Sequence, residues 1–193
     1  MRPDPVIPLQ PLSTLHTVRL RLEPLEERHA AALFDGLRDG ALSEWTGEHA
    51  PATLESLAAR YRALEARTSP DGREAWLNWA LWSVPDAAYV GLVQATVHSD
   101  HTANVGYVLF RDAWSRGYAL EASAALIDSL SLEWGVRVIW ATVDVDHRRS
   151  IALLEDLGFL RMLRRHVGVV PDSSSDEYVY CLSLEPPPSP FLA

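Results

Sequence analysis

The feature that most constrains the fold is a run of three strand-like segments in the middle of the chain. Residues 76–84 and 89–98 are rich in aromatic and β-branched side chains, which favour strands. Residues 85–88, Pro-Asp-Ala-Ala, lie between them and suit a hairpin connection. Residues 105–110 form a third segment of the same kind. Because short connections join antiparallel neighbours, the run predicts an antiparallel meander.

The flanking sequence predicts further strands and helices around this meander. Upstream, residues 17–22 alternate like a half-buried strand, and helical patterns follow at about 26–37 and 53–66. Downstream, the pattern predicts a helix at 117–134, a strand at 136–143, a short helix at 148–157 that Gly158 ends, and two strands around 159–169 and 177–184. The expected fold class is therefore α+β (α/β), with a mixed, mostly antiparallel sheet of about seven strands flanked by about four helices.

The chain is long enough for one domain with one sizeable core. It has 193 residues, of which 48% are hydrophobic. Four prolines among the first eleven residues predict that residues 1–14 form an extended Pro-rich arm. A second Pro-rich run predicts a tail at residues 185–193. We therefore expect a single domain over residues 15–184.

Charge and cysteine content exclude several classes of function. The formal net charge is −9, whereas nucleic-acid-binding proteins need clustered Lys and Arg, so no nucleic-acid partner is expected. The acidic balance suits either a basic partner or solubility alone. Cys181 is the only cysteine, so no intramolecular disulfide and no cysteine-based metal site can form, and we expect no metal. Without an apolar leader or a run of about 20 apolar residues, we expect a cytoplasmic protein with no membrane partner.

A turn between the third strand and the following helix has the composition of a phosphate-binding site. Its sequence is Arg116-Gly117-Tyr118-Ala119, and the backbone N–H groups at a helix start point toward any anion placed there. Gly117 lets the backbone approach a phosphate closely, Ala119 keeps the next turn small, and Arg116 can add a charge-assisted contact. A single glycine at a helix start is more often ordinary turn chemistry, so the prediction depends on its context.

Five motifs supply that context. They are Val105-Gly106-Tyr107-Val108-Leu109, Trp114-Ser115-Arg116-Gly117-Tyr118-Ala119-Leu120-Glu121-Ala122 and Ser150-Ile151-Ala152-Leu153-Leu154-Glu155-Asp156-Leu157-Gly158-Phe159, with Arg19-Leu20-Arg21-Leu22-Glu23-Pro24 and Trp76-Leu77-Asn78-Trp79-Ala80 upstream. Together they resemble the GNAT N-acetyltransferases over nearly the whole chain, and most of all the RimJ/RimL-like ribosomal-protein acetyltransferases. The resemblance implies the GNAT acyl-CoA N-acyltransferase fold and acetyl-CoA as cosubstrate.

The resemblance also implies where the parts of acetyl-CoA bind. The pyrophosphate would lie on the backbone amides of residues 116–119. The pantetheine arm would pair with edge groups of Val108 and Leu109, in the way that an added strand pairs with a sheet. This pairing requires a gap between the strands predicted at 105–110 and 136–143.

Several positions near the last two helices depart from the family pattern. His147 stands where the family commonly has Asn; its imidazole can still hydrogen-bond pantetheine, or it can be a surface residue at the helix start. Leu154 stands where many members have a Tyr that protonates the departing thiolate. Ser150, typical of this branch, could donate a hydrogen bond to the CoA sulfur, or it could be a plain helix cap. Trp114 can pack under the turn or touch the ligand.

The implied reaction is direct transfer of the acetyl group to a primary amine in a ternary complex. The acceptor would be a protein N-terminus or a small-molecule amine. A neutral amine attacks the thioester itself, so Cys181 would be a bystander, and the Val108 N–H would hold the oxyanion. The alternative function is a catalytically silent acyl-CoA-binding module, and the chain is expected to be a monomer or a homodimer.

The sequence leaves the proton acceptor open. Relatives often place a Glu just before the Gly-Tyr pair, where this chain has Asn104 and Val105. The candidates are Glu48, His49, His98, His101 and Asp144. Among the tryptophans, Trp45 is predicted at the rim of an acceptor pocket and Trp79 in the core.

Overall fold

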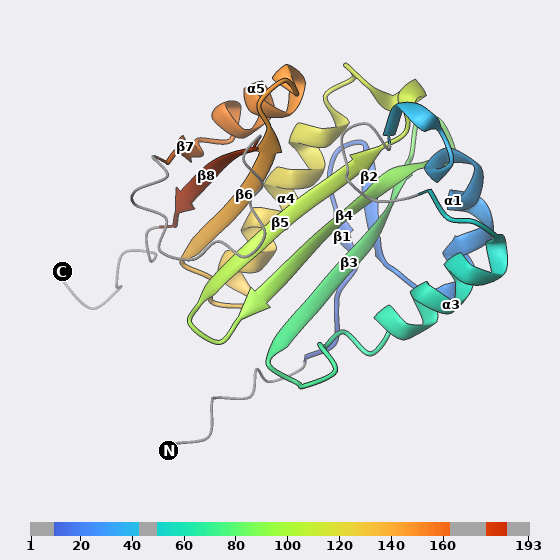
Figure 1. Cartoon of the computed structure of the whole chain (residues 1–193), viewed down its shortest axis with the longest axis horizontal. Coiled ribbons are helices and arrows are strands. Elements are labelled where there is room, and N and C mark those ends of the chain that lie inside the picture. The colour runs from blue at the N-terminus through green and yellow to red at the C-terminus, as the bar shows by residue number, and fades with distance from the viewer. Residues whose placement is uncertain (1–9, 43–49, 163–176, 185–193) are drawn as a thin grey trace.

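A computed structural model describes residues 10–42, 50–162 and 177–184, which form one sheet with helices on both faces (Figure 1). In chain order the elements are β1 (Leu15–His16), β2 (Leu20–Pro24), the 3₁₀ turn η1 (Glu27–His29), α1 (Ala30–Leu37), α3 (Leu54–Leu64), β3 (Glu74–Ser83), β4 (Ala88–His98), β5 (Thr102–Leu109), the 3₁₀ turn η2 (Arg111–Ala113), α4 (Tyr118–Leu132), β6 (Val138–Asp144), α5 (Arg148–Asp156), β7 (Leu160–Arg161) and β8 (Glu177–Ser183).

The sheet has eight strands in the described part of the chain, in the order β1-β2-β3-β4-β5-β6-β8-β7. The predicted meander forms its centre, where β3, β4 and β5 pair antiparallel through short turns. The pairing of β5 with β6 is the one parallel pair in this sheet, because α4 carries the chain back between these two strands. The predicted fold class, a mixed and mostly antiparallel sheet flanked by helices, is therefore confirmed.

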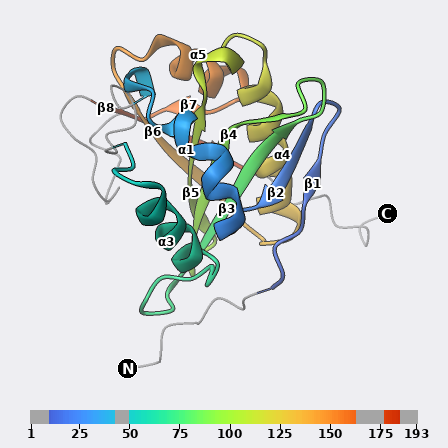
Figure 2. The ribbon, with the colours of Figure 1, turned by 90° about the vertical axis from the view of Figure 1, so that its right-hand side faces the viewer.

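The helices divide between the two faces of the sheet (Figure 2). The helix α4 packs over the larger apolar core together with α5, and its buried side chains include Ala122, Leu126 and Leu130. The helices α1 and α3 pack against each other on the other face, over a smaller core that contains Leu33 and Leu57. Each helix buries one apolar stripe, as an amphipathic helix on a sheet must.

The alternation of side chains along β3 shows how one strand serves both faces. Leu77, Trp79 and Leu81 point into the larger core, and the Trp79 indole N–H donates to the Ser13 carbonyl at 3.0 Å. The prediction that Trp79 is a core residue is therefore confirmed. Between these residues, Asn78 faces the side that carries α1 and α3.

The element boundaries differ from the predictions by a few residues at most for the elements described in full. The largest shifts are at element starts: α1 begins at Ala30, after the turn η1, rather than at 26, and β2 and β5 begin at Leu20 and Thr102 rather than at 17 and 105. The helix α5 ends as predicted, with Gly158 in the left-handed conformation at a φ of 84°. The strand predicted around 159–169 is described only as Leu160–Arg161, and its remainder lies largely outside the described residues.

Residues 10–14 of the predicted arm lie against the domain. Leu12 is buried in the larger core, and the Gln10 side-chain amide donates to the Glu133 carbonyl at 2.6 Å. The structure does not describe residues 1–9 or 185–193, so the rest of the predicted arm and the predicted tail lie outside it. No helix in the described part of the chain has the length and apolar character needed to span a bilayer.

Candidate active site

The site is built around a gap in the sheet between β5 and β6. These strands pair only at their first residues, where Thr102–Asn104 run beside Val138–Trp140, and they separate beyond that point. Each strand keeps its other neighbour, since β5 stays paired with β4 as far as Leu109 and β6 with β8 as far as Asp144. The gap is therefore held open by regular pairing on both outer sides, and the predicted parting of the two strands is confirmed.

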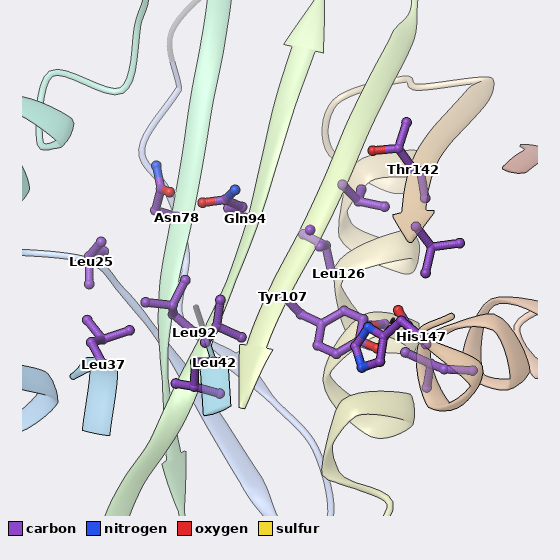
Figure 3. Close-up of a pocket in the computed structure, with 18 of the residues that line it drawn as sticks. Leu25, Leu37, Leu42, Asn78, Leu92, Gln94, Tyr107, Leu126, Thr142 and His147 are labelled. Carbon is purple, nitrogen blue, oxygen red and sulfur yellow. Dashed lines mark hydrogen bonds between the residues drawn. The ribbon is translucent and has the colours of Figure 1, made fainter. Parts of the chain in front are cut away.

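A cavity of about 550 Å³ passes through this gap and reaches both faces of the sheet. On the α4 and α5 side its lining includes Ser123, Leu126, His147, Ser150 and Leu154, and on the α1 and α3 side it includes Leu25, Leu37, Leu57, Asn78, Leu92 and Gln94. Figure 3 shows Tyr107 and His147 close together beside the gap, with Asn78 and Gln94 on the neighbouring strands. One cavity can therefore receive a thioester from one side and an acceptor from the other.

The direction of the backbone groups along β5 decides which residues can bind a ligand in the gap. Phe110 donates its N–H to the Val90 carbonyl at 2.9 Å, and a Cβ added at Gly91 would collide with the Val108 carbonyl oxygen. Even-numbered residues of β5 therefore turn their backbone groups toward β4. The N–H of Val108 points away from the gap, so this register does not suit the predicted roles of Val108 in binding pantetheine and the oxyanion.

Odd-numbered residues of β5 turn their backbone groups the other way. At the start of the strand, the His101 carbonyl accepts the Arg137 N–H from the β6 side at 2.8 Å. At its end, the Leu109 carbonyl accepts the Trp114 indole N–H at 2.7 Å. The edge groups at the open part of the gap are therefore those of Tyr107 together with the Leu109 N–H. The hydrogen bond also fixes the Trp114 ring within the turn, in agreement with a packing role.

Ser150 lies in the first turn of α5 and reaches into the cavity, with 8% of its surface exposed. Its Oγ accepts a hydrogen bond of 2.8 Å from the Tyr107 hydroxyl, which crosses the gap from β5. Burial raises the pKa of Tyr107 and the bond to Ser150 lowers it, with a raised pKa as the net result. Tyr107 is therefore a neutral hydrogen-bond donor at neutral pH, and the Ser150 proton can point elsewhere.

Tyr107 is a site residue that the sequence analysis missed. It appears in the sequence only as part of the motif Val105-Gly106-Tyr107-Val108-Leu109, without a predicted role of its own. The position of its hydroxyl beside Ser150 depends on how far β5 and α5 lie apart, which no local pattern contains. The one feature of the sequence that could have pointed to Tyr107 is its position directly after Gly106 in this motif.

His147 is the N-cap residue of α5 and lines the cavity, but its side chain makes no capping hydrogen bond to the helix. Leu154 is buried one turn after Ser150 and also lines the cavity. His147 and Ser150 are thus brought together at the gap, on the same turn of helix and beside Tyr107. Both positions would allow the predicted contacts with CoA, which stay predictions.

The predicted phosphate turn lies at the start of α4 and is not part of the cavity lining. Gly117 is the N-cap, with a φ of 78° that only glycine adopts readily. The N–H groups of Tyr118 and Ala119 stand at the first positions of the helix, where no carbonyl of the same helix can accept them. The turn therefore presents unpaired backbone donors and the positive end of the helix dipole.

Two arginines brace this turn. The Arg116 guanidinium donates to Asp86 and to the Tyr118 hydroxyl, each at 2.9 Å, so its side chain is engaged with the β3–β4 hairpin. The Arg19 guanidinium donates to the Arg116 carbonyl at 2.8 Å and pairs with Glu121 at 2.7 Å. In this arrangement Arg116 holds the turn in place, and its predicted contact with a phosphate stays a prediction.

Asp86 is the acceptor at the centre of this bracing network. Hydrogen bonds from Arg116, Ser83 and Tyr118 lower its pKa to about 2, so the carboxylate stays charged across the physiological range. Asp86 appeared in the sequence only as a hairpin residue. Its partner on the α4 turn is 30 positions away, and the sequence has no local pattern that joins them.

The structure separates the predicted proton acceptors. Asp144 lines the cavity at the end of β6. His98 and His101 lie at the far end of the sheet, at the β4–β5 turn, where His98 is 3.4 Å from Glu74. Glu48, His49 and Trp45 lie outside the described residues. Asp144 is therefore the candidate from this set that the described structure places at the gap.

Two further findings concern cofactor and nucleophile chemistry. Within residues 10–42, 50–162 and 177–184, no group of three or more His, Cys, Asp or Glu side chains could hold a metal ion. Cys181 lies in β8, and burial raises the pKa of its thiol, which keeps it protonated at neutral pH. A protonated thiol away from the cavity lining is a poor nucleophile.

Comparison with known proteins agrees with this architecture. The family described as "Acetyltransferase (GNAT) domain" matches residues 19–160. The uncharacterized protein YkkB of Bacillus subtilis (strain 168) is 26% identical over 160 residues, which are 75% of this chain and 83% of that protein.

Solved structures share the fold. A GNAT-family acetyltransferase from Bacillus anthracis has a TM-score of 0.70 at 20% identity, over 89% of this chain and 98% of that one. RimL, a ribosomal L7/L12 alpha-N-protein acetyltransferase solved in complex with coenzyme A, has a TM-score of 0.73 at 16% identity. The match covers 89% of this chain and 98% of that one. Because the family matches residues 19–160, the chain belongs to the GNAT acetyltransferase family and is an acetyl-CoA-dependent acetyltransferase.

Proposed function

We propose that the protein transfers the acetyl group of acetyl-CoA directly to a primary amine, on a protein N-terminus or a small molecule, within a ternary complex. The observation that carries this proposal is the single cavity that crosses the sheet at the β5–β6 gap. Acetyl-CoA on the α4 and α5 side and an amine on the α1 and α3 side would meet there without an enzyme nucleophile. The protonated Cys181 thiol agrees with direct attack.

Acetyl-CoA would be held by three sets of groups. The backbone donors of Gly117, Tyr118 and Ala119 suit the pyrophosphate, with Arg116 bracing the turn. The edge groups of Tyr107 and the Leu109 N–H suit the amide groups of pantetheine. His147, on the other side of the gap, can bond the pantetheine arm from α5.

The chemical step needs a proton to leave the amine and a proton to reach the sulfur. The neutral amine nitrogen attacks the thioester carbon, the new N–C bond forms, and the C–S bond breaks with its electron pair leaving on sulfur. Asp144 at the end of β6 is our candidate to take the amine proton, directly or through a water. The Ser150 hydroxyl, oriented by the bond from Tyr107, can donate a hydrogen bond to the departing thiolate, which then takes its proton from solvent. The backbone N–H of Tyr107 or of Leu109 can hold the oxyanion.

The experiment that tests this proposal is thiol release from acetyl-CoA with and without a panel of primary amines. We expect release to require the amine, and mass spectrometry to find one acetyl group on the amine for each thiol released. Binding of acetyl-CoA without amine-dependent release on any member of the panel would contradict the proposal. That outcome would match a catalytically silent acyl-CoA-binding module instead.

A further inference from the structure

The floor of the cavity on the α1 and α3 face carries two carboxamides side by side. Asn78 on β3 stands directly opposite Gln94 on β4, and Gly106 on β5 stands opposite Gln94 on its other side. Both amides belong to the cavity lining, and both are labelled in Figure 3. Because directly opposite residues share a face of the sheet, the two amides form a polar row that leads to the gap.

These two amides have hydrogen-bonding capacity that the described protein does not use. The Asn78 residue is only 9% exposed, yet its side chain makes one long bond, from Nδ2 to the Trp76 carbonyl at 3.4 Å. The Gln94 side chain is exposed and makes no hydrogen bond with any described residue. A carboxamide has two donors and an acceptor, and no side-chain atom of Asn78 is among the fully buried polar atoms without a partner, so the unused donors and acceptors of both amides face the cavity.

The amide of Gln94 lies over Gly106 of β5. A Cβ placed at Gly106 would be in ordinary contact with this side chain, 3.4 Å from its Nε2. The Gln94 amide therefore stands on the strand that borders the gap, within the cavity lining.

The walls around this row are mostly apolar, although Ser56, Arg60 and Tyr61 of α3 also line this side. The apolar walls are formed by Leu25, by Leu37 of α1, by Leu57 and Leu64 of α3, and by Leu92 of β4. Leu25, Leu57 and Leu92 are buried in the protein. An apolar chamber with a few placed polar groups is typical of sites that select a small group by shape and by hydrogen bonds.

The charges near the row disfavour an acceptor that carries a carboxylate. Asp144 and Glu177 stand opposite each other on β6 and β8 and both line the cavity across the gap. Arg60 is the one Lys or Arg side chain among the described lining residues, and it lies on the exposed side of α3. A neutral amide, which needs both a donor and an acceptor, fits the Asn78–Gln94 row better than an anion does.

We propose that the acceptor is a primary amine whose adjacent carbon carries both an apolar side chain and a neutral carboxamide. This is the chemistry of an apolar amino-acid amide and of the first residue of a peptide with an apolar N-terminus. The side chain lies among the leucines, the carboxamide bonds Asn78 and Gln94, and the amine points into the gap. This inference rests on the function proposed above, since it names the acceptor for that same reaction.

The first part of the test compares four small amines by kcat/KM for thiol release. They are leucinamide, isoamylamine without the carboxamide, leucine with a carboxylate, and serinamide with a polar side chain. Each kcat/KM is calculated on the concentration of neutral amine, because the carboxamide and the carboxylate also change the pKa of the amine. We expect leucinamide to have the highest kcat/KM, with the value for each of the others lower by about tenfold or more. A site that is built to hydrogen-bond a polar group discriminates in this way against substrates that lack the group.

A peptide amide that begins with Leu distinguishes a peptide acceptor from a small-molecule acceptor. A kcat/KM equal to or higher than that of leucinamide points to a peptide, and a much lower one points to a small molecule.

The second part uses a matched pair of variants. Gln94→Leu removes one amide of the row with little change in size, and we expect it to bring leucinamide and isoamylamine within about threefold of each other. Asn104→Leu is the control, because Asn104 is an amide on the same face of β5 that does not line the cavity. It should keep the preference for leucinamide. The KM for acetyl-CoA should stay unchanged in both variants.

The outcomes separate this inference from the proposed function. No turnover of any amine would contradict the proposed function. Turnover of isoamylamine or leucine as fast as leucinamide, or an amide preference that Gln94→Leu leaves intact, would overturn the inference while the transferase activity stands. If Gln94→Leu failed to fold, Asn78→Asp would replace it, with selective loss of the amide substrates expected and an unchanged preference contradicting the inference.

Discussion

At the scale of single residues, the hydroxyl pair at the gap carries the proposed chemistry. Ser150 accepts a hydrogen bond from Tyr107 at 2.8 Å, so its own O–H can donate a hydrogen bond to the sulfur. We expect Ser150→Ala to lower kcat by about a hundredfold with little change in the KM for acetyl-CoA, because the bond to the thiolate forms only as the C–S bond breaks. Tyr107→Phe should lower kcat by about tenfold, since it removes only the orientation of Ser150.

The control for this pair is Ser129→Ala, which removes a buried hydroxyl of α4 away from the cavity. Its kcat should stay at the wild-type value. Steady-state thiol release on the three single variants and on the Tyr107/Ser150 double variant measures these effects. If the double variant were about as slow as Ser150→Ala alone, the two residues would act as one unit, and full additivity would contradict the proposed relation.

The second residue-scale prediction concerns the proton acceptor. Asp144→Asn should lower kcat by about a hundredfold near neutral pH, because the amine then loses its proton only to solvent. The deficit should shrink as the pH approaches the pKa of the acceptor amine, where the neutral form is already present. Asp146→Asn, two residues further on and outside the cavity lining, is the matched control. A pH-independent deficit in Asp144→Asn would exclude this role.

Residue roles were the hardest part to predict from the sequence. Ser150 and His147 were found because the resemblance assigns their positions, and the structure places both at the gap. Val108 was assigned a backbone role that its register does not suit, since the odd residues of β5 face the gap. Which residues of a strand face a given neighbour depends on the strand pairing, and the local sequence does not specify it.

At the scale of elements, the close packing of β4 against β5 holds one side of the gap in place. Gly91 has a φ of 151° and lies against Val108 at the point where β3 and β4 change register. We expect Gly91→Ala to lower the free energy of unfolding by about 3 kcal/mol, from backbone strain together with overpacking. Denaturant unfolding measures this change.

Gly40→Ala is the control, because a Cβ at Gly40 would meet nothing within 4 Å. Its unfolding free energy should stay within about 0.5 kcal/mol of the wild type, as is usual for exposed substitutions. An equally small effect of Gly91→Ala would show that the β4–β5 pairing tolerates a side chain there.

Most elements could be predicted from the sequence, because their patterns are local. The amphipathic spacing in 53–66 and the capping pair of Thr53 and Ser56 define α3, and Gly158 ends α5. The gap between β5 and β6 could be expected only through the family resemblance. Periodicity identifies strands, but whether two of them stay paired along their whole length depends on the rest of the sheet.

At the scale of the whole molecule, an ionic cluster around a buried carboxylate joins β2 to the helical face. Glu23 of β2 accepts hydrogen bonds from Tyr89 at 2.9 Å and from Arg21 at 2.6 Å, and it also contacts His29 at 3.2 Å and the Arg28 guanidinium at 3.8 Å. Burial alone would raise the pKa of Glu23, but the bonds from His29, Arg21 and Tyr89 outweigh it and bring the pKa to about 2 from 4.5. The carboxylate is therefore charged in the folded protein well into acid.

A lowered pKa in the folded state makes stability depend on pH in one direction. The contribution of Glu23 is fully present above pH 4.5, and it is lost as the pH falls from there toward 2. Between pH 7 and pH 3 we expect the wild type to lose about 2 kcal/mol more unfolding free energy than Glu23→Gln, which cannot titrate. Denaturant unfolding at the two pH values measures this difference, with the exposed Glu55→Gln as control. Parallel losses in wild type and Glu23→Gln would contradict the assignment.

The most direct test of the central claim is a crystal structure of the protein with coenzyme A. We expect the pyrophosphate on the backbone N–H groups of Gly117–Ala119 and the pantetheine arm along the odd-numbered edge of β5. The sulfur should lie within hydrogen-bond reach of the Ser150 hydroxyl, in the gap between β5 and β6. Coenzyme A bound with its sulfur outside this gap, or with its diphosphate away from the start of α4, would contradict the account.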